Sequence, residues 1–272
     1  MIKKNERALL YLLSKTKSLK RLQLVKLMFL ASEEQSLYNF IPYHFGPFSF
    51  QLYQDLRHLE RDGYLTWTEN DVQFIERAFP KPDPYTQNVI TSVISQFGSL
   101  SKDDLLDYVY NKYPEMTIFS KIKQMKDYSR DETGIVTIGY EGKNIDKFLA
   151  LLVENKVEKL IDVRKNAFSM KYGYSKNQLA SMLEKLDIKY LHLPELGIES
   201  DKRKNLSKKG FAELFQRYAI ELAEKQDLLD VIKSLAQKEK VALMCFEAKE
   251  ADCHRGVIAR RFRDEGLDVV AL

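Results

Sequence analysis

The sequence predicts an α/β protein in which a mainly helical N-terminal domain precedes a C-terminal three-layer domain. Two observations support this fold class. From Gly134 onward, short apolar segments of strand length alternate with segments of helical periodicity, which is typical of a parallel sheet with helices on both faces. Residues 1–80 instead show apolar spacings of three and four, which indicate helices. We therefore expect domains at 1–120 and 134–272, joined by a charged linker at 121–133.

The composition sets limits on the class of protein. The chain has 272 residues, of which 44% are hydrophobic, and this is enough for two ordinary domains. It has no apolar run of the roughly 18–20 residues that cross a membrane, and its first residues lack the pattern of a signal peptide. Because the chain has only 2 cysteines, disulfide bonds do not explain its stability, and a reducing compartment is indicated. We expect a cytoplasmic protein that does not enter a membrane.

The N-terminal domain is predicted from its helical faces and turns. We expect helices around 9–13, 22–29 and 52–59, strands at 64–68 and 72–75, and two more helices within 85–113. Between the second and third helices, residues 43–49 are predicted to form a turn, because Gly46-Pro47 stops a helix and Ser49 is a suitable N-cap. Two helices followed by a two-stranded wing predict a winged-helix-like domain.

The C-terminal domain is predicted as alternating strands and helices. The expected strands are 135–138, 159–163, 189–193, 241–245 and 267–271, and the expected helices are 145–155, 179–186, 211–236 and 256–263. The predicted strands, the last excepted, are followed by distinctive polar residues: Gly139, Tyr140 and Glu141; Asp162 and Arg164; His192 and Glu195; Cys245, Glu247, Cys253, His254 and Arg255. Because parallel strands end at one edge of a sheet, these side chains are expected to converge on one site.

The stretch from Cys245 to Arg255 carries the most chemistry, because both cysteines of the chain lie in it. Cys253 precedes His254 and Arg255, and neighbouring cations lower the pKa of a thiol, so Cys253 is a candidate nucleophile. A metal site formed by Cys245, Cys253 and His254, with His192 or Glu247, is an alternative. Zinc sites usually have closer pairs of cysteines than this eight-residue spacing, so we assign no metal and leave the cofactor unknown. Cys245 is equally well explained as a buried apolar residue.

The other candidate residues have both a functional and a structural explanation. Arg164 and Arg255 are expected to hold an anionic group, or else to form ion pairs. Glu247, His254 and Asp162 join Cys253 as candidate catalytic residues, because carboxylates and imidazoles transfer protons. Further candidates for substrate binding are Tyr140 and Tyr174, which could stack on a base, together with Ser169 and Lys176. The structural alternative for the two tyrosines is the packing of an irregular loop.

Five ordered motifs resemble a known family. They are Thr137–Gly142, Leu160–Arg164, Ser169 with Tyr172–Leu179, Tyr190–Gly197, and the closing Cys-x-Glu and Cys-His-Arg. Together they resemble domain-of-unknown-function family 488 over residues 134–272, which implies an α/β domain. Members usually have proline after Asp-Val-Arg, where this chain has Lys165. The Phe-Gly-Pro-Phe-Ser turn resembles, more loosely, that of winged-helix and antitoxin-like helical modules.

Basic residues form three clusters that bear on the choice of partner. They are Lys3, Lys4, Arg7, Lys15, Lys17, Lys20, Arg21 and Lys26; Lys202, Arg203, Lys204, Lys208 and Lys209; and Arg255, Arg260, Arg261 and Arg263. Clustered cations bind phosphates, although each cluster could also be a solvated helix face. The first hypothesis is an enzyme with hydrolytic or base-removing chemistry on a nucleic acid or nucleotide. The alternatives are a non-catalytic DNA-binding regulator or sensor whose α/β domain binds a small anion, and an interaction module whose N-terminal domain binds a protein. Oligomeric state is left open.

Overall fold

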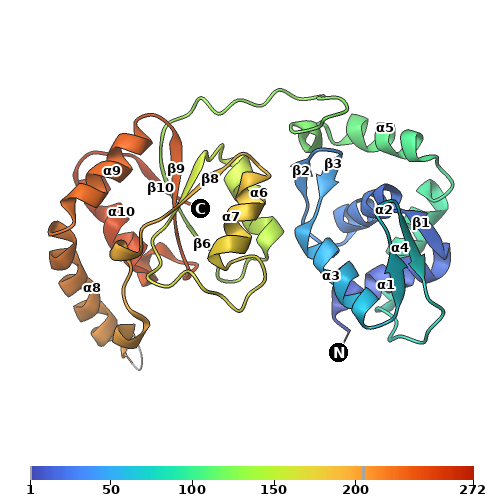
Figure 1. The fold of residues 1–272 in the computed structure, drawn as a ribbon, viewed down its shortest axis with the longest axis horizontal. Coiled ribbons are helices and arrows are strands. Elements are labelled where there is room, and N and C mark those ends of the chain that lie inside the picture. The colour runs from blue at the N-terminus through green and yellow to red at the C-terminus, as the bar shows by residue number, and fades with distance from the viewer. Residues whose placement is uncertain (1, 204–205) are drawn as a thin grey trace. The chain divides into compact units, whose positions relative to one another are not determined.

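The computed structural model describes residues 2–203 and 206–272, which form two compact units. The first unit ends at Tyr128 and the second begins at Ser129, within the predicted linker (Figure 1). Each unit is described separately below.

The N-terminal unit is built on three helices and a small antiparallel sheet. Its first elements are α1 (Lys4–Thr16), β1 (Ser18–Lys20), α2 (Arg21–Glu34), α3 (Phe50–Arg61), β4 (Leu65–Trp67) and β5 (Asp71–Phe74). The sheet has the strand order β1-β5-β4, so the strand between the first two helices pairs with the second strand of the hairpin. The leucines of α1 and α3 are buried in one core. Strand β1 was not predicted, because three residues are too few to show alternation.

Residues 41–48 form a hairpin rather than a simple turn. Strands β2 (Ile41–Tyr43) and β3 (Gly46–Phe48) pair in antiparallel fashion, and Gly46 has a positive φ of 80° at the start of the return strand. A glycine adopts this conformation without strain. Ser49 caps α3, as predicted, because its hydroxyl accepts a hydrogen bond of 3.1 Å from the Leu52 backbone N–H.

The unit is completed by α4 (Pro84–Phe97), α5 (Lys102–Lys112) and a 3₁₀ turn at Pro114–Thr117. Ser101 caps α5 by accepting a hydrogen bond from the backbone of Asp104. Both helices contribute apolar side chains to the same core as α1 and α2. The prediction of a mainly helical N-terminal part is confirmed.

The C-terminal unit contains a five-stranded parallel sheet. Its strands are β6 (Gly134–Gly139), β7 (Lys159–Asp162), β8 (Lys189–His192), β9 (Lys240–Cys245) and β10 (Val269–Ala271). Their order across the sheet is β10-β6-β9-β7-β8, and all four pairings are parallel. Every strand predicted in this part of the chain is present.

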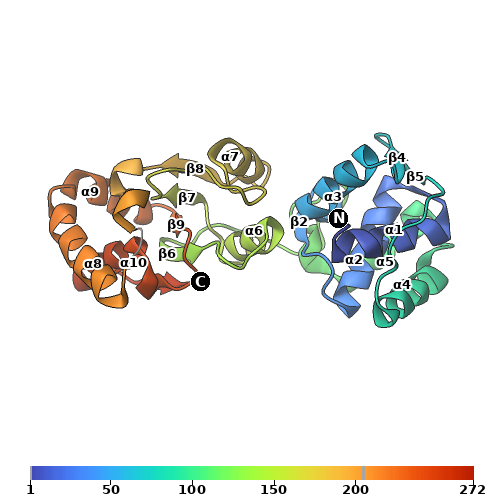
Figure 2. The same ribbon diagram turned by 90° about the horizontal axis from the view of Figure 1, so that it is seen from below.

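Helices cover the sheet on both sides. They are α6 (Ile145–Glu154), α7 (Lys176–Glu184), α8 (Lys208–Ala223), α9 (Gln226–Ala236) and α10 (His254–Asp264), with short 3₁₀ turns at Pro194–Leu196, Ser200–Arg203 and Glu250–Asp252. Figure 2 shows α6 and α7 on one face and α8, α9 and α10 on the other. The predicted three-layer α/β class is therefore confirmed. Lys204 of the second basic cluster lies outside the described residues.

Among the residues that the structure describes, no helix combines the length and apolar character required to cross a membrane.

Candidate functional site

The strand ends share one edge of the sheet, as predicted, but their side chains do not form a single site. Asp162 lies in register with Met244, one residue before Cys245. Because successive side chains of a strand point to opposite faces, Asp162 and Cys245 leave the sheet on different sides. Val163 and Cys245 belong to the core beneath α8, α9 and α10. The predicted residues therefore form two groups, one on each face.

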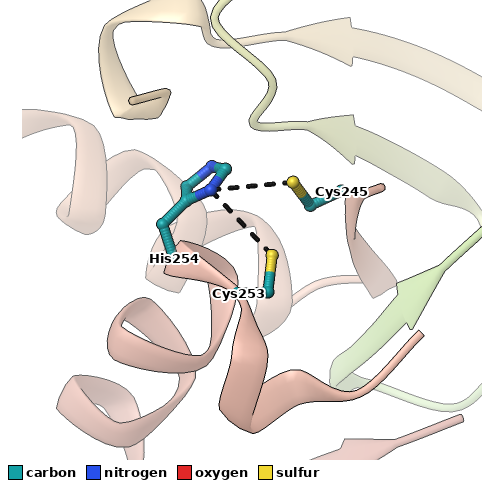
Figure 3. Close-up of side chains that lie close together, drawn as sticks. All are labelled: Cys245, Cys253 and His254. Carbon is teal, nitrogen blue, oxygen red and sulfur yellow. Dashed lines mark hydrogen bonds between the residues drawn. The ribbon is translucent and has the colours of Figure 1, made fainter. Parts of the chain in front are cut away.

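The first group consists of two cysteines and a histidine at the start of α10 (Figure 3). Cys245 ends β9, whereas Cys253 and His254 lie where α10 begins. The Nδ1 atom of His254 is 3.6 Å from the Cys245 sulfur and 3.9 Å from the Cys253 sulfur. All three side chains are buried, and both thiols are free.

Cys245 and Cys253 are eight positions apart in the sequence, and the folded loop after β9 brings them together. Arg255 is buried, and its guanidinium donates to the carbonyl oxygens of Glu247 (2.5 Å) and Ala248 (3.0 Å). The Glu141 carboxylate accepts a hydrogen bond of 2.9 Å from the Ala248 backbone N–H. These contacts hold the loop folded against the sheet. Arg255 thus supports the cysteine–histidine group from its own loop, and its two Nη groups donate to protein carbonyls rather than to a ligand.

The surroundings of His254 determine which ring nitrogen faces the cysteines. Nε2 lies 2.9 Å from the carbonyl oxygen of Val163, which can only accept a hydrogen bond. Nε2 therefore carries a proton, and in the neutral ring the Nδ1 lone pair points at the two sulfur atoms. The ring of Tyr218 packs edge-on against the imidazole, with centroids 5.8 Å apart.

The two thiols have opposite pKa shifts. Burial alone would raise the pKa of Cys253, but the hydrogen bond that it accepts from Cys245 helps to outweigh burial, and the pKa is lowered to about 6. The pKa of Cys245 is raised well above its ordinary value, first by its hydrogen bond to Cys253 and then by burial. The Glu247 carboxylate is half-buried and accepts from the Cys245 thiol at 3.3 Å. Glu247 is therefore close enough to exchange a proton with this group.

The comparison with protein families finds one match in this part of the chain. Residues 144–262 match the model of the family described as Domain of unknown function DUF488. The C-terminal unit contains a DUF488 domain. The matched residues include Cys245, Cys253 and His254. Three of the five strands, β7, β8 and β9, lie within the match, whereas β6 and β10 lie outside it. Comparisons with curated proteins and with solved structures gave no match.

The second group of the DUF488 domain lies on the other face of the sheet and is centred on Asp162. The Asp162 carboxylate accepts two hydrogen bonds from the Arg164 guanidinium, at 2.8 and 2.6 Å, and one from the Tyr190 hydroxyl at 2.6 Å. Burial alone would lower the pKa of Arg164, but the Asp162 carboxylate outweighs it and raises the pKa. Arg164 also donates to the Tyr174 carbonyl oxygen. This is a buried ion pair with almost all of its hydrogen bonds made within the protein.

Tyr140 and Tyr174 face each other rather than an open surface. Their rings stack with centroids 4.2 Å apart, and both side chains are buried. The Tyr140 hydroxyl accepts from Arg164 at 3.2 Å, and the Tyr174 hydroxyl donates to backbone carbonyls at the start of α6. A base could not stack on Tyr174 without repacking this core, so the structure matches the alternative of loop packing.

Ser169 and Lys176 lie in and after the loop that follows β7. The Ser169 hydroxyl accepts from the Lys171 backbone, and the Lys176 ammonium lies 3.5 Å from Nδ1 of His192. His192 in turn contacts the Arg164 carbonyl oxygen at 2.9 Å through Nε2. Lys176 is exposed, so it is the predicted binding residue on this face that solvent reaches most freely.

A cavity of about 590 Å³ adjoins the cysteine–histidine group of the DUF488 domain. It lies between α8 and α10, and Cys253, Gly256 and Arg260 are among its lining residues. Arg261 and Arg263 also line it, but each forms an ion pair, with Glu265 (2.7 Å) and with Glu250 (2.6 Å). Three arginines of the third basic cluster, Arg260, Arg261 and Arg263, therefore line this cavity, whereas Arg255 is buried.

The first basic cluster is less uniform than its sequence indicates. Lys26 is buried, while Lys3, Lys17 and Lys20 form ion pairs with acidic neighbours. The cluster is therefore partly neutralised and does not form one continuous basic face.

Sequence reasoning missed two tyrosines that support the two groups. Tyr190 alternates with His192 along β8, a spacing that could have placed it on the Asp162 face. Tyr218 packs on His254 and donates to the Leu196 carbonyl oxygen at 2.6 Å. Its place in α8 carries no sequence signal beyond helical periodicity, so only the packing of α8 on α10 reveals its role.

Proposed function

We propose that the DUF488 domain catalyses a hydrolytic or base-removing reaction on a nucleotide or nucleic acid, and that the N-terminal unit binds the nucleic acid. The observation that carries this proposal is the cavity between α8 and α10, which is bordered by Cys253 and by Arg260. An anionic substrate bound in this cavity would lie beside the cysteine–histidine group.

The size and charge of the cavity favour a nucleotide. Ligand cavities of a few hundred cubic ångströms hold molecules of this size, and about 590 Å³ is within that range. Arg260 is exposed and forms no ion pair within the part of the chain that the structure describes. A guanidinium of this kind can bind a phosphate through two parallel hydrogen bonds.

The groups beside the cavity supply acid–base chemistry. Glu247 transfers protons in this proposal, because its carboxylate contacts the Cys245 sulfur, and His254 contacts both sulfur atoms through Nδ1. Asp162 and Arg164 act as support on the opposite face, where their ion pair holds the loop after β7. Arg255 holds the loop after β9 through hydrogen bonds to the carbonyl oxygens of Glu247 and Ala248.

The N-terminal unit has the element order of a winged helix. Strand β1 lies between the first two helices and pairs with β5, and the β4–β5 hairpin follows α3. In helix-turn-helix proteins the second helix of the motif enters the major groove. Helix α3 holds that place here, and Arg57 is exposed on it. We therefore infer that α3 contacts DNA or RNA, with a protein partner as the alternative.

Two measurements on the purified chain test this proposal. Fluorescence polarisation of labelled DNA and RNA across a salt series should show binding that weakens as salt rises, because cations on the protein release counterions. Arg57→Ala should reduce this affinity by about tenfold, which is about 1.4 kcal/mol, whereas Lys112→Ala, an equal loss of charge on α5, should not.

The second measurement is a search for products by mass spectrometry after incubation with oligonucleotides and free nucleotides. Turnover should be lost in His254→Gln and reduced in Arg260→Ala, while Arg217→Ala, on the exposed side of α8, should retain it. Binding that persists without any product would favour the DNA-binding regulator. Absence of binding at low salt would exclude the nucleic-acid part of the proposal.

A further inference from the structure

We propose that Cys245, Cys253 and His254 bind one zinc ion and leave its fourth coordination position open. Two sulfur atoms and an imidazole nitrogen are typical zinc ligands, since zinc prefers these borderline-soft donors. The three donor atoms all lie within 4.8 Å of one another. Figure 3 shows the imidazole and both thiols directed towards a common point.

The distances between the donor atoms fit a tetrahedral ion. Zinc–sulfur bonds of about 2.3 Å and zinc–nitrogen bonds of about 2.0–2.1 Å, at tetrahedral angles, separate sulfur from nitrogen by about 3.6 Å. The corresponding separations from His254 Nδ1 are 3.6 Å to Cys245 and 3.9 Å to Cys253. A zinc ion would therefore need only small movements of these side chains.

The surroundings of His254 are those of a metal ligand. Histidines that bind metals usually donate their other ring N–H to a carbonyl or carboxylate, which fixes the tautomer and the ring orientation. His254 makes this contact with the Val163 carbonyl oxygen at 2.9 Å, and Tyr218 packs against the ring. The lone pair that would bind the metal is thus already directed at the two sulfur atoms.

The secondary structure holds the ligands in place without relying on a close pair of cysteines. Cys245 ends a central strand of the sheet, and Cys253 and His254 begin α10. The intervening loop is fastened by Arg255 through the carbonyl oxygens of Glu247 and Ala248. In the sequence, the eight-residue spacing of the cysteines argued against a zinc site. The folded loop brings their two sulfur atoms within 4.8 Å of each other.

Within the described residues, no fourth carboxylate, thiol or imidazole lies within 4.8 Å of all three donor atoms. Glu247 comes near, because its carboxylate is 3.3 Å from the Cys245 sulfur. Three protein ligands with an open position are typical of catalytic zinc sites, where the metal activates water, and structural zinc sites have four. A carboxylate beside such a site can carry a proton. This catalytic part rests on the proposed function, whereas zinc binding itself does not.

A second group of potential ligands, Glu6, Asp55 and His58 in the N-terminal unit, does not support the same inference. The Glu6 carboxylate accepts a hydrogen bond of 2.7 Å from the Lys3 backbone, and the Asp55 carboxylate accepts one of 2.9 Å from Tyr38. Lys3 also places its ammonium 3.8 Å from both carboxylates. The carboxylates of this group already have hydrogen-bond donors and a shared ammonium as partners within the protein.

The test is the metal content of the full chain, purified under reducing conditions and measured by mass spectrometry of the elements. We expect one zinc ion per chain, and its loss in Cys245→Ser, Cys253→Ser and His254→Gln. His192→Gln, a histidine on the other face of the sheet, is the matched control and should retain zinc. Cobalt added to metal-free wild-type protein should produce the charge-transfer absorption of cobalt–thiolate bonds, a readout that needs neither the variants nor activity.

Metal-free wild-type protein that has two reactive thiols on denaturation but takes up neither zinc nor cobalt would overturn the proposal. Zinc that remains bound in all three variants would also overturn the proposal. So would wild-type protein that contains iron or copper instead of zinc. The result is separable from the proposed function. Zinc binding without any nucleic-acid binding or turnover would leave the metal site and exclude the function. Turnover by zinc-free protein would leave the function and exclude the catalytic role of zinc.

Discussion

Arg164 and Arg255 lie buried near the same edge of the sheet, and the protein itself uses most of their donors. Arg164 pairs with the Asp162 carboxylate, and Arg255 donates to carbonyl oxygens of its own loop. In the sequence both looked like binding residues, because arginine after a strand is typical of anion sites. The partner of Arg164 is Asp162, two positions away, and the partners of Arg255 are carbonyl oxygens of a loop that folds back onto it. The fold of the chain, rather than residue type, determines these contacts.

At this residue scale, we expect Asp162→Ala to destabilise the C-terminal unit strongly. Removing the carboxylate leaves the Arg164 charge buried without its partner, and such losses cost about 3–5 kcal/mol. Denaturant unfolding followed by circular dichroism should show the decrease. Asp230→Ala, which removes an exposed ion pair with Lys233, is the control and should have little effect. Equal stability of the two variants would contradict a supporting role for the Asp162–Arg164 pair.

At the scale of elements, most helix and strand positions followed from local pattern, and the clearest exception is the β2–β3 hairpin. Residues 43–49 were predicted as a turn, because Gly46-Pro47 stops a helix. The strands on either side are three residues each, too short for alternation to indicate them. Lys26 on α2 reaches this hairpin, where its buried ammonium contacts the carbonyl oxygens of Phe45 and Pro47. This contact joins a helix to a hairpin some twenty residues away.

Lys26 should make the stability of the N-terminal unit depend on pH. Burial lowers its pKa from 10.5 to about 7 in the folded state. Between these values the unfolded chain binds more protons than the folded chain, so the free energy of unfolding should rise as the pH increases from 7 towards 10. The single tryptophan of the chain, Trp67, lies in this unit, so its fluorescence reports the unfolding.

The matched variants for this pH dependence are Lys26→Met and Lys102→Met. The first should lose the rise in stability between pH 7 and 10. The second removes an exposed lysine of the same unit and should keep it. The assignment would be wrong if both variants kept the slope of the wild-type protein.

At the scale of the whole molecule, the chain forms two units with separate cores. One core is built from α1, α2 and their neighbours, and another lies between the sheet and α8, α9 and α10. Residues 121–127, at the end of the first unit, are exposed throughout. In the sequence, helical periodicity changes to alternating strands and helices at Gly134, and each pattern needs its own core.

We expect residues 1–128 and 129–272, expressed separately, each to fold. A unit with its own hydrophobic core can fold alone. Each fragment should show a cooperative thermal transition by circular dichroism, and Trp67 fluorescence should report only the first. A fragment that is soluble but shows no transition would contradict the division into two units.

The sequence by itself determined the α/β class, the order of the strands along the C-terminal unit, and the stretch from Cys245 to Arg255 as the one that holds both cysteines. Those features depend on local periodicity and on residue type, which act over a few positions. Residues 211–236 were expected as one helix but form two, α8 and α9. Only the tertiary structure decided that Asp162 and Cys245 point to opposite faces, because this depends on the register between β7 and β9. It also decided that Cys245 meets His254, because a folded loop and the packing of α10 on the sheet join residues that the sequence separates.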